Sequence, residues 1–189
     1  MANDHKTFNI YNPSKNFVWT RSRIIWVLMI FSLVSIFFVL NILKIPEKQI
    51  PQWLGCSIFT PMILGFLVYM INIWFPEELK GKIDGKLIFE IDKITINNEI
   101  LFTKDIKRIQ ISISDYKKKF IRYNQFDGAF SQGCKNELII ILLNNQKKSC
   151  FFQIQQPKET LQMVNQLDHY TKMGLLTKEE ENNILNYNW

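Results

Sequence analysis

Two long apolar runs, separated by a short polar segment, constrain this sequence more than any other feature. Residues 24–43 are 20 consecutive positions without a charged side chain, and residues 53–75 are another 23. At about 1.5 Å of rise per residue, either run is long enough to cross a hydrocarbon layer about 30 Å thick. A backbone in lipid must satisfy its own hydrogen bonds, so both runs are predicted to be helices. Two buried helices of a soluble core are the alternative, but such helices usually have a polar face and neither run has one.

The charges that flank the two runs predict their orientation. Four basic residues precede the first run, two lie between the runs and three follow the second: Lys6, Lys15, Arg21, Arg23; Lys44, Lys48; Lys80, Lys82, Lys86. Flanks rich in Lys and Arg stay in the cytoplasm, so we expect a multi-pass helical hairpin with both termini cytoplasmic and the turn at residues 45–52 outside. A cleaved signal peptide is the competing interpretation of the first run. That run is too long for a signal peptide, and no small-x-small cleavage pattern follows it.

Small residues within the runs are candidates for helix–helix packing. Ser32 and Ser35 lie in the first run, and Gly55, Pro61 and Gly65 lie in the second. Small side chains let helices approach closely, and Pro61 is expected to kink its helix. Neither run contains Asp, Glu, Lys, Arg or His, so an ion or proton pathway formed by this chain alone is not expected.

Beyond residue 76 the pattern changes from continuous hydrophobicity to alternation, which is typical of strands. Strands are predicted at residues 87–91, 94–96, 100–102, 109–113, 120–123, 137–143 and 149–154. The run at 137–143 is apolar throughout, which predicts burial on both faces. Pro157 is predicted to open a helix whose apolar stripe continues to Gly174.

These patterns predict an α+β membrane protein: a two-helix transmembrane hairpin plus a small antiparallel β domain closed by a C-terminal amphipathic helix. The expected layout is a cytoplasmic N-terminal tail or interfacial lead-in, the hairpin, a linker, the β domain, and a C-terminal tail or short helix. The corresponding residues are 1–23, 24–75, 76–86, 87–176 and 177–189.

The residues 85–111, 136–155 and the helix from Lys158 carry a resemblance in layout to the pleckstrin-homology (PH) superfold. The whole chain is similar to small bacterial membrane proteins in which a two-helix hairpin precedes a PH-like cytoplasmic domain. The resemblance implies a location in the bacterial inner membrane. Lipid-binding members of the PH family place basic residues around the first hairpin loop, expected here at Asp92–Lys93. One Lys beside an Asp does not reproduce that pattern, so no lipid-binding residue is carried over.

The end of the chain leaves two interpretations open. Residues 174–181 (GLLTKEEE) are similar to short C-terminal oligomerisation modules of bacterial proteins, in which a turn precedes a small second helix. Thr177 followed by Glu180 fits a capping box at the start of such a helix. An ordinary frayed tail is the alternative.

A group of basic residues is the main candidate for a binding surface: Lys117, Lys118, Lys119 and Arg122, with Lys104, Lys107 and Arg108 earlier in the chain. It could be a solvated loop, or it could contact anionic lipid at about 1 kcal/mol per charge. The interleaved aromatic residues Tyr116, Phe120 and Tyr123 raise nucleic acid as a third interpretation. No nucleic-acid partner is expected.

Catalytic and metal-binding patterns are weak in this sequence. Asp168 and His169 are adjacent, so on a helix their side chains point about 100° apart and do not form a dyad. Cys56, Cys134 and Cys150 have neither metal-ligand spacing nor accompanying histidines, and free thiols are expected. No phosphate-binding or hydrolase motif occurs. We therefore expect no catalytic residue, no cofactor and no metal.

The expected function is that of a non-enzymatic, membrane-anchored adaptor or scaffold. It would present the β domain at the cytoplasmic face to a protein partner, a second copy of the chain, or lipid headgroups. Two alternatives remain open. One is an immunity-type protector or a subunit of a bacterial membrane or secretion complex. The other is an enzyme whose site is completed by a partner.

Overall fold

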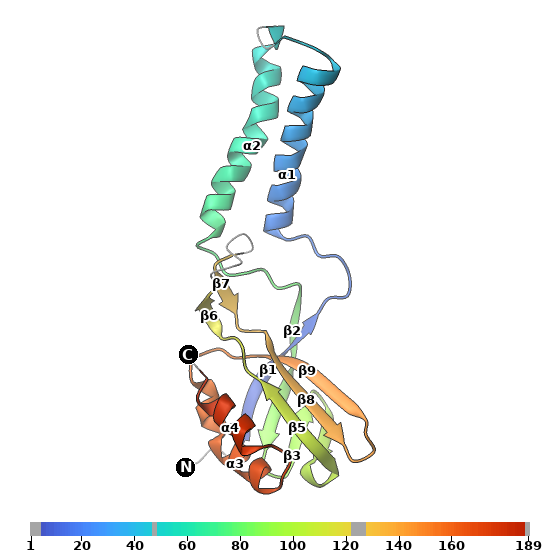
Figure 1. The fold of residues 1–189 in the computed structure, drawn as a ribbon, viewed down its shortest axis with the longest axis vertical. Helices are drawn as coiled ribbons and strands as arrows, with labels where there is room; N and C mark the ends of the chain where they lie inside the picture. Colours follow the sequence, from blue (N-terminus) through green and yellow to red (C-terminus); the bar gives the residue numbers. More distant parts are fainter. Residues whose placement is uncertain (1–4, 47–48, 122–127, 188–189) are drawn as a thin grey trace. The chain divides into compact units, whose positions relative to one another are not determined.

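The computed structural model describes residues 5–46, 49–121 and 128–187, and the chain divides into two compact units (Figure 1). The sheet unit comprises the residues up to 15, residues 79–119 and the residues from 131 onward. The hairpin unit comprises residues 16–78 and 120–130. The predicted α+β class is confirmed, with two apolar helices and a seven-stranded antiparallel sheet.

The seven strands form one sheet in the order β4-β3-β2-β1-β9-β8-β5. Their bounds are β1 His5–Pro13, β2 Gly81–Glu90, β3 Lys93–Ile96, β4 Glu99–Phe102, β5 Ile106–Ser112, β8 Asn136–Leu142 and β9 Lys147–Gln153. A separate two-stranded sheet pairs β6 (Lys117–Phe120) with β7 (Phe130–Gln132). The strand predicted at 120–123 therefore begins earlier, and its residues 122 and 123 lie outside the described residues. β7 lies in a segment for which no strand is predicted.

Strand β1 is the main difference from the predicted layout, which treats residues 1–23 as a tail. β1 lies inside the sheet and pairs with β2 on one side and β9 on the other. Phe8 and Ile10 alternate with less buried neighbours and are only 2% and 1% exposed. Alternation of this kind is the pattern of a half-buried strand, and the aromatic and β-branched residues of HKTFNIYNP favour it.

The hairpin unit is inserted between two neighbouring strands of the sheet. Register pairs between β1 and β2 run from His5 with Glu90 to Pro13 with Gly81. The chain therefore leaves the sheet after Pro13 and returns at the adjacent position, so the sheet unit is discontinuous in sequence. The first hairpin loop is this insertion rather than Asp92–Lys93, and residues 81–86, predicted as linker, belong to β2.

The seven-stranded sheet must be strongly curled. β4 and β5 are its two edge strands, yet only the 3-10 turn Thr103–Asp105 joins them. Four Cα steps of 3.8 Å span at most about 15 Å, whereas six strand spacings of about 4.8 Å make a flat sheet about 29 Å wide. Lys148 of β9 also reaches Glu99 of β4, with Nζ 2.8 Å from Oε1. The strands therefore wrap around one core, whose fully buried members include Leu87, Phe89, Ile94, Ile109, Leu138, Ile140 and Phe152.

Burial along β8 alternates, in contrast to the prediction of burial on both faces. Leu138 and Ile140 are fully buried, whereas Ile139 and Ile141 are only partly buried. One face of the strand points into the curled core and the other is only partly buried, so a continuous apolar run here does not mark a two-sided core strand.

Two short helices complete the sheet unit (red in Figure 1). The helix predicted from Pro157 begins as a 3-10 segment, Glu159–Met163, and continues as α3 (Val164–Lys172). Leu167 and Tyr170 of α3 are fully buried, and the Tyr170 hydroxyl donates a hydrogen bond to the Glu90 carbonyl. Helix α3 thus anchors the core at the end of β2.

Helix α4 (Lys178–Leu185) replaces the frayed tail that was one interpretation of the C-terminus. The predicted capping box is present: the Glu180 N–H donates to Thr177 Oγ1 at 3.1 Å, and the Thr177 N–H donates to Glu180 Oε2 at 3.0 Å. The Ile109 N–H donates to the Leu175 carbonyl at 2.8 Å, so the turn before α4 covers part of the β5 edge. Ile184 is 2% exposed and joins the core.

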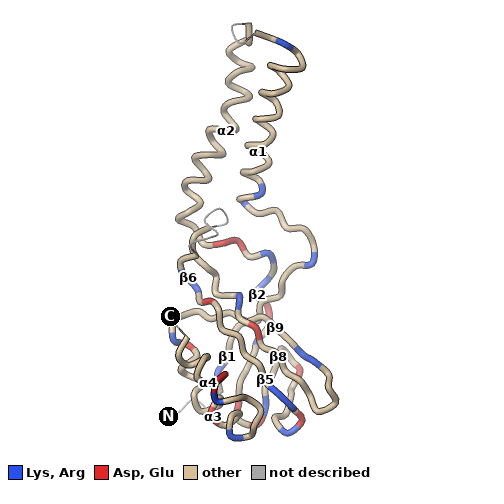
Figure 2. Tube along the Cα trace, in the orientation of Figure 1, with Lys and Arg blue, Asp and Glu red and all other residues tan. Residues whose placement is uncertain are grey.

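The hairpin unit contains two helices. Helix α1 (Arg21–Phe37) continues as a π-helical segment, Phe38–Ile42, and helix α2 (Gln52–Asn72) returns. Thr20 caps the start of α1 by accepting a hydrogen bond from the Arg23 N–H. Charged residues lie only at the ends of these helices (Figure 2). The two helical spans, of 22 and 21 residues, are each long and apolar enough to cross a membrane.

Candidate functional site

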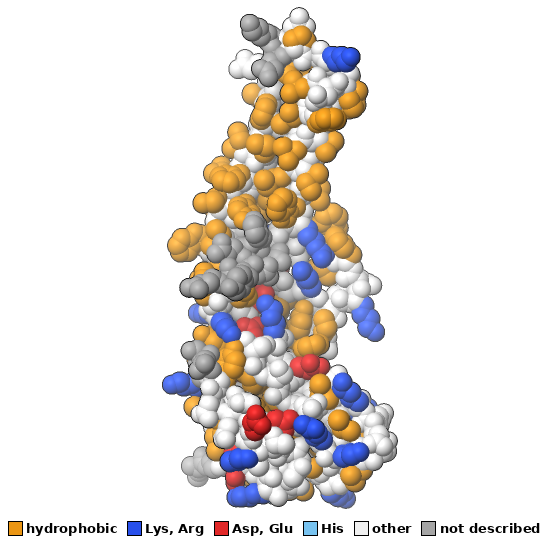
Figure 3. Space-filling model, viewed as in Figure 1, with side chains coloured by type: hydrophobic (Ala, Val, Ile, Leu, Met, Phe, Trp, Pro, Cys, Tyr) orange, Lys and Arg blue, Asp and Glu red, His pale blue; other side chains and the backbone are white. Residues whose placement is uncertain are grey.

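The face of the hairpin that Figure 3 shows is covered by apolar side chains. Eleven large apolar side chains of the span 21–42 and nine of α2 are exposed, 20 in total. Even at about 1 kcal/mol for each half-exposed side chain, leaving them in water would forgo roughly 20 kcal/mol, more than the usual stability of a domain. A contiguous apolar surface of this size is one that lipid or another protein covers.

Four of the five residues predicted for helix packing fall into two groups. Ser32 and Gly65 are buried, and a Cβ added to Gly65 would lie 3.1 Å from Met29 Cγ of α1. Ser35 and Gly55 are not at the close contact: Ser35 is partly exposed, and nothing lies within 4 Å of a Cβ added to Gly55. Helix α2 continues through Pro61. The helices therefore approach closely at Gly65 and separate toward Gly55.

This difference between the two glycines leads to a prediction. Replacing Gly65 by Leu should destabilise the hairpin by about 1–3 kcal/mol, because the new side chain overlaps Met29 and Ile25. Gly55→Leu is the matched control, and it should be neutral or slightly stabilising because Leu favours helix over Gly. Thermal unfolding in detergent micelles measures both. Equal destabilisation by the two changes would contradict this packing.

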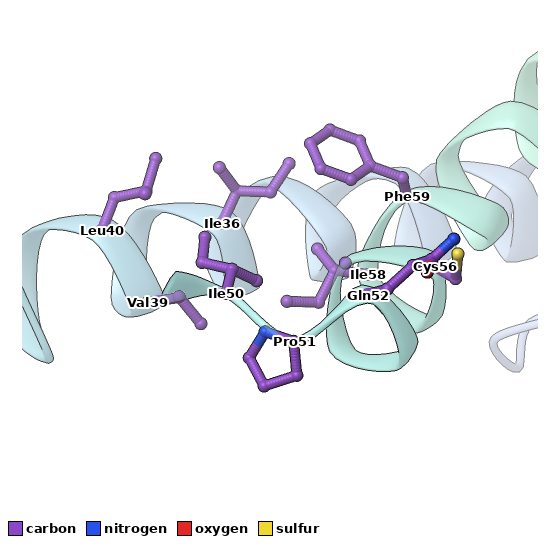
Figure 4. A pocket seen from close by; sticks show the side chains of 10 residues that line it. Ile36, Val39, Leu40, Ile50, Pro51, Gln52, Cys56, Ile58 and Phe59 are labelled. Carbon is purple, nitrogen blue, oxygen red and sulfur yellow. The ribbon is translucent and has the colours of Figure 1, made fainter. Parts of the chain in front are cut away.

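Where the helices separate, they leave an apolar cavity of about 600 Å³ (Figure 4). Its lining comes from the end of α1, the π-helical segment, and the start of α2: Ile36, Val39, Leu40, Ile50, Pro51, Gln52, Gly55, Cys56, Ile58 and Phe59. A π-helical turn adds one residue to the helical repeat and shifts the side chains that follow it. None of the described lining residues is charged, and Gln52 and Cys56 are the polar ones among them.

A set of polar contacts joins the two ends of the hairpin. Arg21 Nε lies 2.7 Å from Glu78 Oε1, and the Arg21 N–H donates to Glu78 Oε2 at 2.5 Å. Arg21 also donates from Nη2 to the Pro76 carbonyl at 2.9 Å and stacks over the Phe75 ring at 5.1 Å. Aromatic side chains flank these contacts: Phe17, Trp19 and Trp74 are 66%, 61% and 79% exposed. Exposed aromatic rings beside basic residues at the ends of apolar helices are typical of a membrane–water boundary.

The structure divides the predicted basic group. Lys104 lies in the 3-10 turn with its Nζ 5.4 Å from the Phe102 ring centroid, and Lys107 and Arg108 lie on β5. Lys107 Nζ donates to Asn145 Oδ1 at 2.9 Å, and Arg108 Nη2 lies 3.0 Å from Glu180 Oε1. These three residues therefore have contacts within the sheet unit that account for their positions.

Lys117, Lys118 and Lys119 belong to β6. Lys119 Nζ donates to the Ser114 carbonyl at 2.8 Å and to the Tyr187 hydroxyl, and it lies 5.0 Å from the Tyr187 ring centroid. Lys117 and Lys118 are exposed, and no contact of their ammonium groups is found among the described residues. Arg122 lies outside the described residues.

A buried polar cluster that the sequence analysis missed holds the segment before β6. Asn136 is fully buried, and its Oδ1 accepts from the N–H groups of Ser114 and Asp115, both at 3.0 Å. Its Nδ2 donates to the carbonyls of Gly133 and Phe152 at 2.9 and 3.2 Å. The Asp115 carboxylate accepts from the Ser131 hydroxyl. Fully paired buried polar groups of this kind fix one local geometry. Sequence gives no signal for them, because most of the paired groups lie 16 to 22 residues apart in the chain.

Asp168 and His169 do not form a catalytic pair in the structure. The Asp168 carboxylate lies 2.6 Å from Lys172 Nζ, whose hydrogen bond lowers the pKa of Asp168, while the carboxylate raises the pKa of Lys172. His169 packs edge-on near the Tyr170 ring at 6.4 Å. Over residues 5–46, 49–121 and 128–187, no three His, Cys, Asp or Glu residues gather as metal ligands would.

The three cysteines are free thiols, with Cys134 buried, Cys150 partly buried and Cys56 exposed. Burial, with a smaller effect of Glu137, raises the pKa of Cys150 to about 11. The thiolate, which is the reactive form, is therefore scarce at neutral pH.

The raised pKa predicts how Cys150 reacts with alkylating reagents. At pH 7 its alkylation should be about a hundredfold slower than that of an ordinary thiol, and the rate should rise about tenfold per pH unit until about pH 11. Glu137→Gln should speed the reaction by removing a nearby negative charge, whereas Glu179→Gln on the exposed face of α4 should not. Mass spectrometry of the alkylated peptide across this pH range measures the rates. A plateau near pH 9 would contradict the assignment.

No protein-family model, curated protein or solved structure matches the chain.

Proposed function

We propose that this protein is a non-enzymatic adaptor, anchored in a bacterial inner membrane by α1 and α2, that presents its sheet unit at the cytoplasmic face to a protein or lipid partner. The observation that carries the proposal is the insertion of an all-round apolar hairpin between two paired strands. The proposed topology depends on where such an insertion places the two ends of the hairpin in a bilayer.

The pairing of β1 with β2 supports a hairpin with both ends on one side. Pro13 and Gly81 are register partners, so the segments before α1 and after α2 start from the same place in one folded unit. A chain that crosses a membrane between these two strands must cross it an even number of times. Basic residues on both flanks, among them Arg21, Arg23 and Lys80, favour the cytoplasm for that side.

The strand order supports a PH-like fold for the sheet unit. β1 to β4 form one antiparallel meander, β5, β8 and β9 form a second, and β1 joins β9 between them. Two such meanders curled around a shared core, with a C-terminal helix packed on the core, are the layout that the PH resemblance implies. We propose the likeness at the level of the fold, without any ligand site taken from that family.

Strand β4 offers a surface for a protein partner. It is an edge strand of the sheet, and Ile100 and Phe102 on it are 51% and 45% exposed. Natural proteins usually protect an apolar edge strand, because its unpaired backbone groups can pair with another chain. This edge favours protein binding over catalysis as the role of the sheet unit.

Cysteine labelling in vesicles tests the topology. Asn98→Cys, in the exposed β3–β4 turn, should react with a membrane-impermeant maleimide only in inverted inner-membrane vesicles. Gln49→Cys, in the exposed connection between the helices, should react only from the opposite side. The wild-type chain supplies the background from its native thiols. Labelling of both positions from the same side, or recovery of the chain in the soluble fraction, would overturn the proposal.

A further inference from the structure

A cavity beside β6 is lined by Lys117 and Lys118, whose ammonium groups have no contact among the residues that the structure describes. We infer that Lys117 and Lys118 bind a phosphate group in this cavity, and that its source is the headgroup of an anionic phospholipid. The choice of a lipid as the source of the phosphate rests on the proposed function, whereas the binding of phosphate itself does not.

The cavity has the size and the lining that an oxyanion needs. Its volume is about 460 Å³, and Tyr116, Lys117, Lys118, Gln155, Gln156 and Pro157 line it. That volume lies within the range of about 300–1,000 Å³ that small-molecule sites occupy. Two ammonium groups supply charge, and two exposed glutamine amides supply neutral donors, which together match the several acceptor oxygens of a phosphate.

Partner contacts distinguish these two lysines from the other described basic residues of the group. Lys104, Lys107, Arg108 and Lys119 each contact an aromatic ring, an amide, a carboxylate or a carbonyl of the sheet unit. Among the residues that the structure describes, the ammonium groups of Lys117 and Lys118 have no such contact. The cavity therefore has charge available for a ligand.

The backbone that carries the two lysines is held in one geometry. The Lys119 N–H donates to the Tyr116 carbonyl at 3.1 Å, which places Lys117 and Lys118 at the centre of a tight turn. Lys118 has φ +72°, a left-handed conformation that lysine rarely adopts, and the Lys117 N–H is fixed by the Ile154 carbonyl at 2.9 Å. The Asn136 cluster holds the residues immediately before this turn. A rigid turn loses little conformational freedom when it binds a ligand.

Chain connectivity favours a lipid as the source of the phosphate. Lys118 precedes Phe120 by two residues, about 7 Å of extended chain. Phe120 packs against Phe130 with ring centroids 6.0 Å apart, and the Phe130 carbonyl accepts from the Glu77 N–H at 2.8 Å. Glu77 follows the end of α2 by five residues. In a membrane-anchored chain, the β6 turn is thus tethered within reach of the headgroup layer.

Native mass spectrometry of the full-length protein in neutral detergent tests the inference. The protein is titrated separately with phosphatidylglycerol, phosphatidylcholine, inorganic phosphate and a single-stranded RNA oligomer. The double variant K117Q/K118Q should weaken phosphatidylglycerol binding about 30-fold, as expected for two charges near a surface. K104Q/K107Q removes the same charge elsewhere on the sheet unit and should change binding less than threefold.

Each outcome decides a different point. Equal losses in the two double variants, equal binding of the two lipids, or a preference for RNA would overturn the inference. Phosphate that binds as tightly as phosphatidylglycerol, with the same loss in K117Q/K118Q, supports the site and assigns free phosphate as its source. If the chain is recovered in solution without detergent while phosphate still binds through Lys117 and Lys118, the membrane proposal fails and the site remains.

Discussion

Replacing residues 14–80 by an Asn-Gly turn is expected to convert the protein from a membrane-pellet protein into a soluble one with its sheet intact. Pro13 and Gly81 are register partners at the ends of β1 and β2. A two-residue Asn-Gly turn is a favoured connection between antiparallel strands, so the excision should close an ordinary β-hairpin. It also removes all 20 exposed large apolar side chains of the two helical spans. High-speed centrifugation and circular dichroism measure where the product is found and whether it is folded.

Two controls sharpen the excision experiment. Removing residues 1–80 deletes β1 as well, and this product should be unfolded or aggregated because β2 and β9 lose their shared neighbour. The intact chain should stay in the pellet and require detergent for release. A soluble, folded product from the deletion of residues 1–80 would contradict the place of β1 in the sheet. If the product of the shorter excision is insoluble, apolar surfaces outside the hairpin must also be covered by lipid or by another protein.

Phe8→Ala is expected to destabilise the sheet unit by about 3–5 kcal/mol, as a buried Phe→Ala change usually does. Phe8 is 2% exposed, and its ring centroid lies 5.9 Å from that of Phe89 and 5.2 Å from that of Phe152. Its loss leaves a cavity where β1, β2 and β9 meet. Thermal unfolding of the full-length protein in detergent, followed by near-UV circular dichroism, reports the change.

Phe151→Ala is the matched control for Phe8→Ala. Phe151 lies on the neighbouring strand β9, but its side chain is 38% exposed and does not belong to the core. The same chemical change there should cost about 1 kcal/mol or less. If both variants unfold at the same temperature as the wild-type chain, β1 does not pack in the core as described.

The hairpin and most of the later strands could be predicted from sequence because their signals are local. Continuous apolar runs identify helices without reference to partners, and the meander β2-β3-β4 consists of strands that pair with their neighbours in sequence. β1 offers no such local support, because 67 residues, 14–80, separate it from β2 and still more separate it from β9. The alternation of Phe8 and Ile10 is short, so in sequence it is hard to tell from a polar tail with a few scattered apolar residues.

The sequence identifies the candidate basic residues, but it does not show which of their charges are already paired within the fold. Lys107, Arg108, Lys117, Lys118 and Lys119 look alike in sequence, since each contributes one positive charge. Lys107, Arg108 and Lys119 pair with residues 38, 72 and 68 positions away in the chain. Their partners are Asn145, Glu180 and Tyr187, respectively. Pairing over such separations is set by the folded topology, so only the structure could separate Lys117 and Lys118 from the rest.

The central position of β1 has a consequence for how the protein is made. β1 leaves the ribosome before the other described strands of the sheet, yet one of its two neighbours, β9, begins only at Lys147. At roughly 5–20 residues per second, about 130 further residues take on the order of 7–26 s to synthesise. Over that interval the first strand waits with one edge unpaired. Biogenesis therefore requires that the nascent N-terminal segment be kept from pairing elsewhere until the last strand emerges.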